Sequence, residues 1–181
     1  MRVYMQSLGC AKNQVDSEMI LGTLKDNITL VKEPTEAELI IINTCAFIEP
    51  ARKEAIETIL DMVEYKEENG AKLIVCGCLP QRYKDEIVNL IPEVDRFISI
   101  AEYGDIANII NNVIKSDYKY NLEFSPLNRI YSTPNYMRYV KTSDGCLNQC
   151  AFCAIPLIRG KLKNRKIEDI VEEVKKEISE G

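Results

Sequence analysis

Three cysteines, Cys146, Cys150 and Cys153, fall within one stretch of eight residues in a sequence that contains no histidine. Without histidine, imidazole ligands and imidazole acid–base catalysis are excluded, so thiolate or metal chemistry is expected. Cubane iron–sulfur clusters are normally held by four cysteine thiolates. Three thiols in one loop therefore suggest a cluster with one iron free of protein ligands. Such an open coordination position is where a substrate or cofactor can bind.

Two other interpretations of this loop stay open. It could form part of a four-cysteine zinc knuckle whose last thiol comes from elsewhere in the chain. The three cysteines could also be buried and inert, as free cysteines often are. The close spacing of three thiols favours the iron–sulfur cluster over both.

The spacing Cys-x3-Cys-x2-Cys, with Phe152 directly before the last cysteine, resembles the cluster-binding loop of the radical S-adenosylmethionine enzymes. That resemblance implies that Cys146, Cys150 and Cys153 hold a [4Fe–4S] cluster whose free iron is chelated by S-adenosylmethionine, with Phe152 against the adenine. It also implies that an electron from a donor protein cleaves the cofactor to a 5′-deoxyadenosyl radical. The cofactor would carry the chemistry, so no side chain is assigned as catalytic.

The composition bounds the remaining possibilities. The chain has 181 residues, 46% of them hydrophobic, so it can bury one good core, with residues left for a second partial unit. A net charge of −5 provides no basic footprint and argues against nucleic-acid binding by this segment. Seven cysteines are too few, and odd in number, for a disulfide framework. With no apolar run long enough to cross a membrane, a reducing cytoplasm is the expected location.

Residues 1–114 alternate short apolar runs with helical patterns. The run 39–42, Leu-Ile-Ile-Ile, is apolar throughout, as expected for a strand covered on both faces. Strand–helix alternation predicts an α/β fold with a doubly wound parallel sheet, and we expect the flavodoxin-like strand order 2-1-3-4-5. The expected strands are residues 3–8, 28–31, 39–42, 73–75 and 97–100, and the expected helices are residues 16–24, 51–63 (ending near residue 70), 83–91 and 106–113.

The periodicity ends after residue 114, and residues 115–136 are interpreted as a linker. Residues 137–142 then predict a strand that leads into Cys146, and residues 167–178 predict a helix ending at Gly181. Residues 137–181 are thus expected to form the first βα unit of a radical S-adenosylmethionine (β/α) barrel. A complete barrel of eight units needs about 200 residues or more, so the chain is expected to be a fragment without full turnover.

A second set of thiols follows the strands of the predicted sheet. Cys10 follows the first strand, Cys45 the third and Cys78 the fourth. Those strands are neighbours in the expected order, and ligands bind at the carboxyl ends of strands in open α/β sheets. The three loops should therefore bring these cysteines together as a second site. Cys76 lies within an apolar strand run and is interpreted as an inert core thiol.

The segments around these thiols narrow the resemblance to the methylthiotransferases, a family within the radical S-adenosylmethionine enzymes. Residues 1–114 then correspond to the N-terminal methylthiotransferase domain. The resemblance implies a second [4Fe–4S] cluster on Cys10, Cys45 and Cys78, which holds the sulfur that a second S-adenosylmethionine methylates before its transfer. It is carried by residues 7–18 (Ser-Leu-Gly-Cys-Ala-Lys-Asn-Gln-Val-Asp-Ser-Glu), 43–48 (Asn-Thr-Cys-Ala-Phe-Ile), 77–83 (Gly-Cys-Leu-Pro-Gln-Arg-Tyr), 155–160 (Ile-Pro-Leu-Ile-Arg-Gly) and 165–170 (Arg-Lys-Ile-Glu-Asp-Ile).

The family has two main bacterial branches. One modifies an isopentenyl-adenosine of tRNA, and the other modifies the β-carbon of an aspartate in the small-subunit ribosomal protein of the decoding centre. Lys-Asn after Cys10 and Ala-Phe-Ile after Cys45 resemble the ribosomal-protein branch. The alternatives are a tRNA methylthiotransferase, a different radical enzyme with structural N-terminal thiols, and a non-catalytic zinc or redox-binding module. Four basic residues in these motifs could contact substrate or cofactor: Lys12, Arg82, Arg159 and Arg165. Basic residues are more often solvated surface groups, so they are interpreted as such and no site role is assigned to them.

Overall fold

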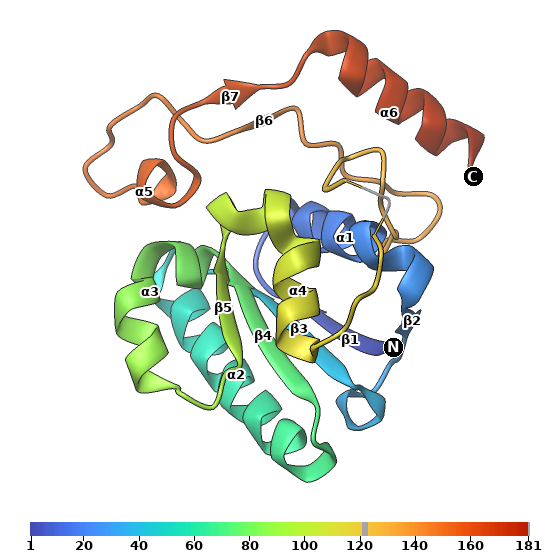
Figure 1. Ribbon diagram of the computed structural model, residues 1–181. Coiled ribbons are helices and arrows are strands. Elements are labelled where there is room, and N and C mark those ends of the chain that lie inside the picture. Colours follow the sequence, from blue (N-terminus) through green and yellow to red (C-terminus); the bar gives the residue numbers. More distant parts are fainter. Residues whose placement is uncertain (121–122, 181) are drawn as a thin grey trace.

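The computed structural model describes residues 1–120 and 123–180 and contains a five-stranded parallel sheet of order β2-β1-β3-β4-β5 (Figure 1). This order confirms the predicted flavodoxin-like arrangement. β3 is buried along its whole length because it lies in the middle of the sheet with helices on both faces. The strands are β1 (Arg2–Ser7), β2 (Thr29–Leu30), β3 (Leu39–Thr44), β4 (Lys72–Gly77) and β5 (Arg96–Ser99).

Two layers of helices cover the sheet. Alternate residues of β3 point to opposite faces, so Ile41 packs with α1 (Ala11–Leu24) and α4 (Ile106–Ile114), while Ile40 packs with α2 (Glu49–Asn69) and α3 (Cys78–Leu90). Short 3-10 turns complete the sheet unit at Lys25–Asn27, Pro34–Glu36 and Ile100–Asp105. The helices α1, α2 and α3 begin earlier than the sequence pattern predicted, while α4 begins at residue 106 as expected. As a result, Cys78 is the first residue of α3, and Cys10 caps the start of α1.

The predicted linker crosses the outer side of α1 and is packed closely against it. Ile130 donates its backbone N–H to the Glu18 carbonyl at 3.1 Å. A Cβ added to Gly22 would lie 2.0 Å from the carbonyl oxygen of Asn128, so only glycine permits this approach. α1 is therefore buried between the sheet and the rest of the chain, and even its polar residues Asp16 and Glu18 are buried. The linker positions 121 and 122 lie outside the described residues.

The C-terminal part of the chain differs from the prediction. Residues 137–142 are not a strand; the chain is extended only at β6 (Ser143–Asp144), which pairs antiparallel with β7 (Lys163–Asn164). A strand needs a neighbour for its backbone groups. Here the carbonyls of Tyr139 and Lys141 instead accept hydrogen bonds from arginine side chains, each at 2.9 Å.

Two helices complete the described structure, α5 (Ile155–Arg159) and α6 (Ile167–Ser179). The sequence pattern predicted α6 but not α5, and the expected helix end at Gly181 lies outside the described residues. Figure 1 shows the C-terminal segment running over α1, with α5 beside α3. The C-terminal segment therefore covers the carboxyl edge of the sheet on the α3 side.

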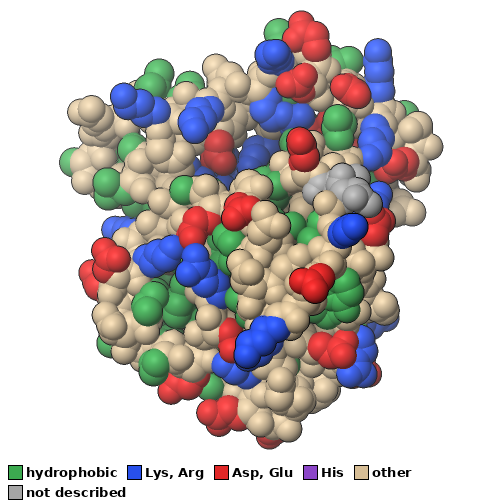
Figure 2. Space-filling view, viewed as in Figure 1, with side chains coloured by type: hydrophobic (Ala, Val, Ile, Leu, Met, Phe, Trp, Pro, Cys, Tyr) green, Lys and Arg blue, Asp and Glu red, His purple; other side chains and the backbone are tan. Residues whose placement is uncertain are grey.

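The surface carries charges of both signs. On the face drawn in Figure 2, Lys and Arg side chains are interspersed with Asp and Glu, and they form no continuous basic stripe. None of the helices in the described ranges combines the length and apolarity that crossing a bilayer requires.

Candidate functional site

The sheet places Cys10, Cys45 and Cys78 at one edge. Each follows the carboxyl end of its strand, and the three strands β1, β3 and β4 are neighbours. Cys45 comes directly after β3, Cys78 directly after β4, and Cys10 three residues after β1. This is the edge at which open α/β sheets bind ligands.

Two glycines let the three loops approach one another. Gly77 has φ +99°, and a Cβ there would lie 2.3 Å from Asn43 Oδ1, so α3 can start close against β3 only with glycine. Gly9 has φ +88°, and a Cβ there would lie 2.5 Å from Cys45 Cβ and 3.0 Å from Cys45 Sγ. The backbone next to Cys10 therefore lies directly against the Cys45 side chain.

Cys45 and Cys78 are nearly buried, and their thiol groups face each other. The hydrogen bond from the Cys78 thiol stabilises the thiolate of Cys45 and lowers the pKa of Cys45 to about 6, against the opposing effect of burial. The same hydrogen bond, together with burial, raises the pKa of Cys78. One thiolate and one thiol thus face each other at neutral pH, and the thiolate is the form that binds metals.

Cys10 completes the set differently, because its side chain is exposed at the start of α1. Among residues 1–120 and 123–180, no group of three or more Cys, Asp or Glu side chains is arranged to hold one metal ion. In a cubane cluster each thiolate binds a different iron, so the ligand sulfurs stand farther apart than those around one ion. Cys45 and Cys78 are buried side by side, and Cys10 is exposed at the same edge of the sheet. This arrangement fits the wider spacing of the ligands of a cubane cluster.

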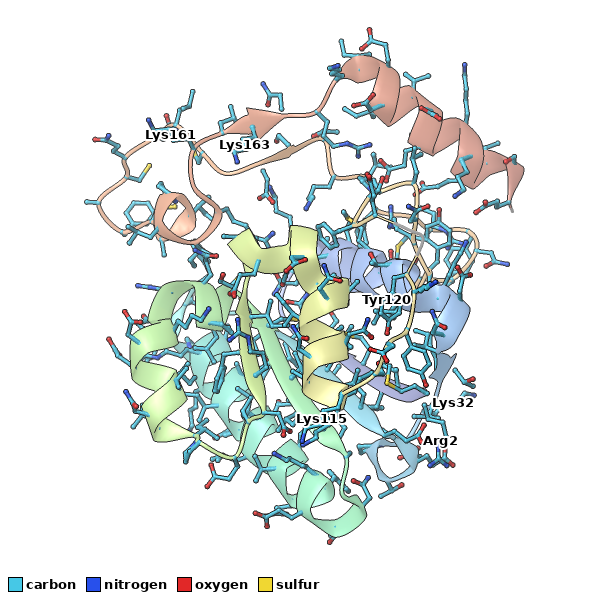
Figure 3. The ribbon with its side chains drawn as sticks, viewed as in Figure 1. Arg2, Lys32, Lys115, Tyr120, Lys161 and Lys163 are labelled. Atoms are coloured by element: carbon cyan, nitrogen blue, oxygen red, sulfur yellow. The ribbon has the colours of Figure 1, made fainter. Side chains whose placement is uncertain are left out.

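The second trio lies in the loop between β6 and α5. Cys146 donates its backbone N–H to the Gly160 carbonyl at 3.1 Å, and Cys153 donates to the Cys150 carbonyl at 3.1 Å. The three thiols are free, and Phe152 is 92% exposed. Lys161 and Lys163, on the segment that returns beside this loop, are also exposed (Figure 3). The loop thus presents Cys150 and Phe152 at the surface, while Cys146 and Cys153 are half-buried.

The interpretation of Arg159 as a solvated surface group is wrong. Its side chain is 3% exposed and reaches from the end of α5 to Asp16 of α1, with Nη1 2.6 Å from Asp16 Oδ2. The other terminal nitrogen, Nη2, lies 2.6 Å from Asn13 Oδ1 and 3.9 Å from Cys78 Sγ. A residue beside the second trio therefore contacts a sulfur of the first.

Asn13 is a second buried residue beside Cys78 that the sequence pattern did not indicate. It is fully buried, and its Nδ2 donates to the carbonyls of Leu8 at 3.0 Å and Thr44 at 2.9 Å. These two bonds fix the amide so that Oδ1 lies 3.5 Å from Cys78 Sγ. In the sequence, only its position could have indicated this residue: Asn13 lies three residues after Cys10, within the segment that carries the family resemblance.

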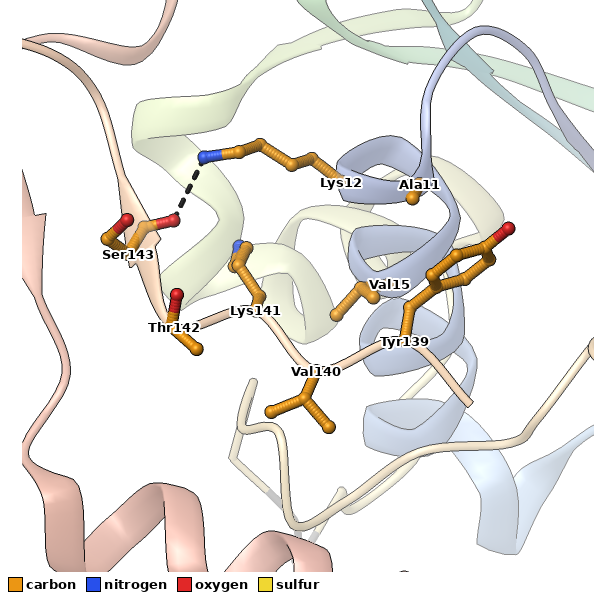
Figure 4. A pocket seen from close by; sticks show the side chains of 8 residues that line it. All are labelled: Ala11, Lys12, Val15, Tyr139, Val140, Lys141, Thr142 and Ser143. Atoms are coloured by element: carbon orange, nitrogen blue, oxygen red, sulfur yellow. Dashed lines mark hydrogen bonds between the residues drawn. The ribbon is translucent and has the colours of Figure 1, made fainter. Parts of the chain in front are cut away.

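A groove runs between α1 and the segment that precedes β6 (Figure 4). In Figure 4 Lys12 spans this groove, and its Nζ donates to the Ser143 carbonyl at 2.9 Å. The cavity measures about 170 Å³ and is lined by Ala11, Lys12, Val15, Tyr139, Val140, Lys141, Thr142 and Ser143. A neighbouring cavity of about 430 Å³ begins at Cys10 and shares Ala11 and Tyr139 with it. Cys10 therefore opens onto a cleft large enough for a small ligand.

Residues 2–99 match the family model described as "Uncharacterized protein family UPF0004". The chain is also similar to proteins named "Ribosomal protein uS12 methylthiotransferase RimO". The protein from Clostridium novyi (strain NT) is 42% identical over 96% of this chain and 40% of its own length. Those from Clostridium botulinum (strain Hall) and Bdellovibrio bacteriovorus are each 45% identical over 99% of this chain and over 42% and 41% of their own lengths. The chain thus spans about two fifths of the curated relatives it matches.

Proposed function

This chain belongs to the protein family UPF0004. From its similarity to proteins named as uS12 methylthiotransferases, we propose that it is part of a methylthiotransferase that modifies the small-subunit ribosomal protein uS12. The observation that carries the proposal is the placing of Cys45 and Cys78 in contact at the carboxyl edge of the sheet, with Cys10 at its rim. The resemblance implies that the target is the β-carbon of an aspartate in that protein.

Two cofactor sites follow from the two thiol trios. Cys10, Cys45 and Cys78 would hold one [4Fe–4S] cluster, and Cys146, Cys150 and Cys153 would hold the other, beside S-adenosylmethionine. When bound, these groups supply hydrogen abstraction from an unactivated carbon and delivery of a methylated sulfur. The protein would receive its electrons from a separate donor protein.

The side chains of this chain prepare the first of these sites. The Cys45 thiolate is available at neutral pH without a separate base, because its pKa is lowered by Cys78. The almost complete burial of Cys45 and Cys78 shields that edge from water, and the exposed Cys10 leaves it open toward the adjoining cleft. Reduced thiols of this kind persist in the cytoplasm, where ribosomal proteins are made, so we place the protein there.

Iron and sulfide analysis of the full-length protein tests the assignment of the first trio. We expect the variant Cys10→Ala/Cys45→Ala/Cys78→Ala to lose about four irons per chain after anaerobic reconstitution. Cys76→Ala is the matched control, since Cys76 is fully buried, burial raises its pKa to about 12, and no ligand role is assigned to it. Unchanged iron in the triple variant, or bound zinc without iron in the parent, would contradict the proposal.

A substrate comparison tests the choice of target. The reconstituted full-length enzyme is incubated with uS12 and, separately, with tRNA that carries isopentenyl-adenosine. We expect a methylthio mass increment on uS12 alone. Modification of tRNA alone would assign the protein to the other branch.

A further inference from the structure

The guanidinium of Arg159 forms a contact between the segment of the second thiol trio and a sulfur of the first. Arg159 is the last residue of α5, which begins two residues after Cys153. Its Nη2 lies 3.9 Å from the sulfur of Cys78, within hydrogen-bonding distance for a sulfur acceptor. One side chain therefore joins the loop of the second trio to a thiol of the first.

The guanidinium is held in this position by fixed acceptors. Nη1 lies 2.6 Å from Asp16 Oδ2 and 3.2 Å from Asp144 Oδ2, and Nη2 lies 2.6 Å from Asn13 Oδ1. Asn13 is itself fixed by two backbone carbonyls, and Asp16 is 1% exposed. A planar guanidinium presents several donors in a rigid fork, so these three acceptors determine where its remaining N–H points. That direction is toward Cys78.

The charges around Arg159 also favour a negative sulfur. Lys141 pairs with Asp16 at 2.6 Å and Lys12 pairs with Asp144 at 3.4 Å. Together with Arg159, these two lysines give three cations against two carboxylates. The group therefore has one positive charge in excess, partly buried beside Cys78. A thiolate, or a cluster ligated by thiolates, supplies the opposite charge, and charge-assisted hydrogen bonds are the stronger kind.

We propose that Arg159 is a positioning residue for the centre on Cys10, Cys45 and Cys78: it donates a hydrogen bond to the Cys78 sulfur, makes that centre easier to reduce, and holds the loop of the other trio against it. Hydrogen bonds to ligand sulfurs and nearby charge are among the factors that set the reduction potential of an iron–sulfur cluster. A donor and a positive charge both stabilise the reduced, more negative state. This inference rests on the proposed function, because it requires that the trio holds a cluster.

The test measures the midpoint reduction potential of that centre by itself. The full-length protein carries Cys146→Ala, Cys150→Ala and Cys153→Ala, so that only the first trio can hold a cluster, and it is reconstituted anaerobically with iron and sulfide. Potentials are read from a dye titration followed by electron paramagnetic resonance. Arg159→Gln should shift the midpoint to a more negative value. Arg159→Lys keeps the charge but cannot reach all the acceptors at once, so it should give a smaller shift in the same direction.

Arg165→Gln is the matched control. Arg165 lies on the same segment and pairs with Glu173, which is not part of the sulfur site, so its loss should leave the midpoint unchanged. A merely structural role for Arg159 would lower the melting temperature without moving the potential. If Arg159→Gln does not fold, as judged by circular dichroism, Arg159→Lys decides the question.

The outcomes separate this inference from the proposed function. A parent protein that takes up no iron on the first trio would contradict the proposed function itself. A parent that takes up iron, with the same midpoint in the folded Arg159 variants, would overturn the role of Arg159 alone. A negative shift in those variants and none in Arg165→Gln would support it.

Discussion

Glu18 of α1 and Arg129 of the linker form a buried ion pair across 111 positions of the sequence. Both Nε and Nη2 of Arg129 donate to Glu18 Oε2, at 3.1 and 2.6 Å. Glu18 Oε1 accepts from the backbone and hydroxyl of Ser132. Arg129 Nη1 reaches Glu173 and Glu177 of α6, so one fully buried guanidinium joins α1, the linker and α6. This pair fixes the C-terminal segment over the sheet unit.

Removing Arg129 should therefore be strongly destabilising. In Arg129→Met, the buried carboxylates of Glu18, Glu173 and Glu177 lose the cation that they share. We expect the free energy of unfolding to fall by about 3–5 kcal/mol. Chemical denaturation monitored by circular dichroism measures this change. Lys53→Met is the control, because the Lys53–Glu57 pair on α2 is exposed and should contribute less than about 1 kcal/mol. Equal effects of the two substitutions would contradict the importance of the buried pair.

Gly77→Ala should prevent the close approach of β4 and β3 at the thiol edge. An alanine Cβ would meet Asn43 Oδ1 at 2.3 Å and the Thr44 carbonyl oxygen at 2.5 Å, in a backbone conformation that side chains rarely adopt. We expect a loss of about 2–5 kcal/mol in the free energy of unfolding. Gly104→Ala, where a Cβ would meet nothing within 4 Å, should change it by no more than about 0.5 kcal/mol. A stable Gly77→Ala protein would show that the edge can relax.

Alkylation of the metal-free protein should show whether Cys78 lowers the pKa of Cys45. Because the hydrogen bond from Cys78 lowers the pKa of Cys45 to about 6, the reaction of Cys45 with iodoacetamide should rise with pH around that value. In Cys78→Ala the stabilising donor is gone, so the rise should move toward the ordinary thiol pKa of 9.0. Mass spectrometry of the Cys45 peptide over a pH series measures both profiles.

Cys76 is the internal reference in the same digest. It is fully buried, and burial raises its pKa to about 12, so it should stay unmodified at neutral pH in the folded protein. A Cys45 profile that is unchanged in Cys78→Ala would show that the thiol–thiol hydrogen bond does not set its pKa.

Phe152→Ala separates ligand binding from stability. The ring is 92% exposed and packs little against the rest of the chain, so the free energy of unfolding should change by less than about 0.5 kcal/mol. If the ring lies against the adenine of S-adenosylmethionine, its loss removes a stacking contact of about 0.5–1.5 kcal/mol. We then expect the Kd of the iron-loaded full-length protein for that cofactor to rise roughly 2- to 10-fold. An unchanged Kd, measured by equilibrium dialysis, would remove Phe152 from the cofactor site.

The fold of the sheet unit could be predicted because each strand and helix is indicated by a pattern within a short stretch of sequence. The apolar run at residues 39–42 identified a central strand, and strand–helix alternation led to the observed sheet order. The starts of α1 and α3 were not predicted, because their first turns, Ala-Lys-Asn-Gln and Cys-Leu-Pro-Gln, contain too few large apolar residues to show a helical repeat. The strand expected at residues 137–142 was wrong because no adjoining strand of the described chain is there to pair with it.

The sequence by itself determined which thiols can act together: spacing groups Cys146, Cys150 and Cys153, and strand order groups Cys10, Cys45 and Cys78. Only the tertiary structure decided which charges are buried beside them. Arg159 and Arg129 look like surface residues in a sequence. Whether an arginine can be buried depends on acceptors that folding brings to it, and here those lie 143 and 111 positions away, in α1.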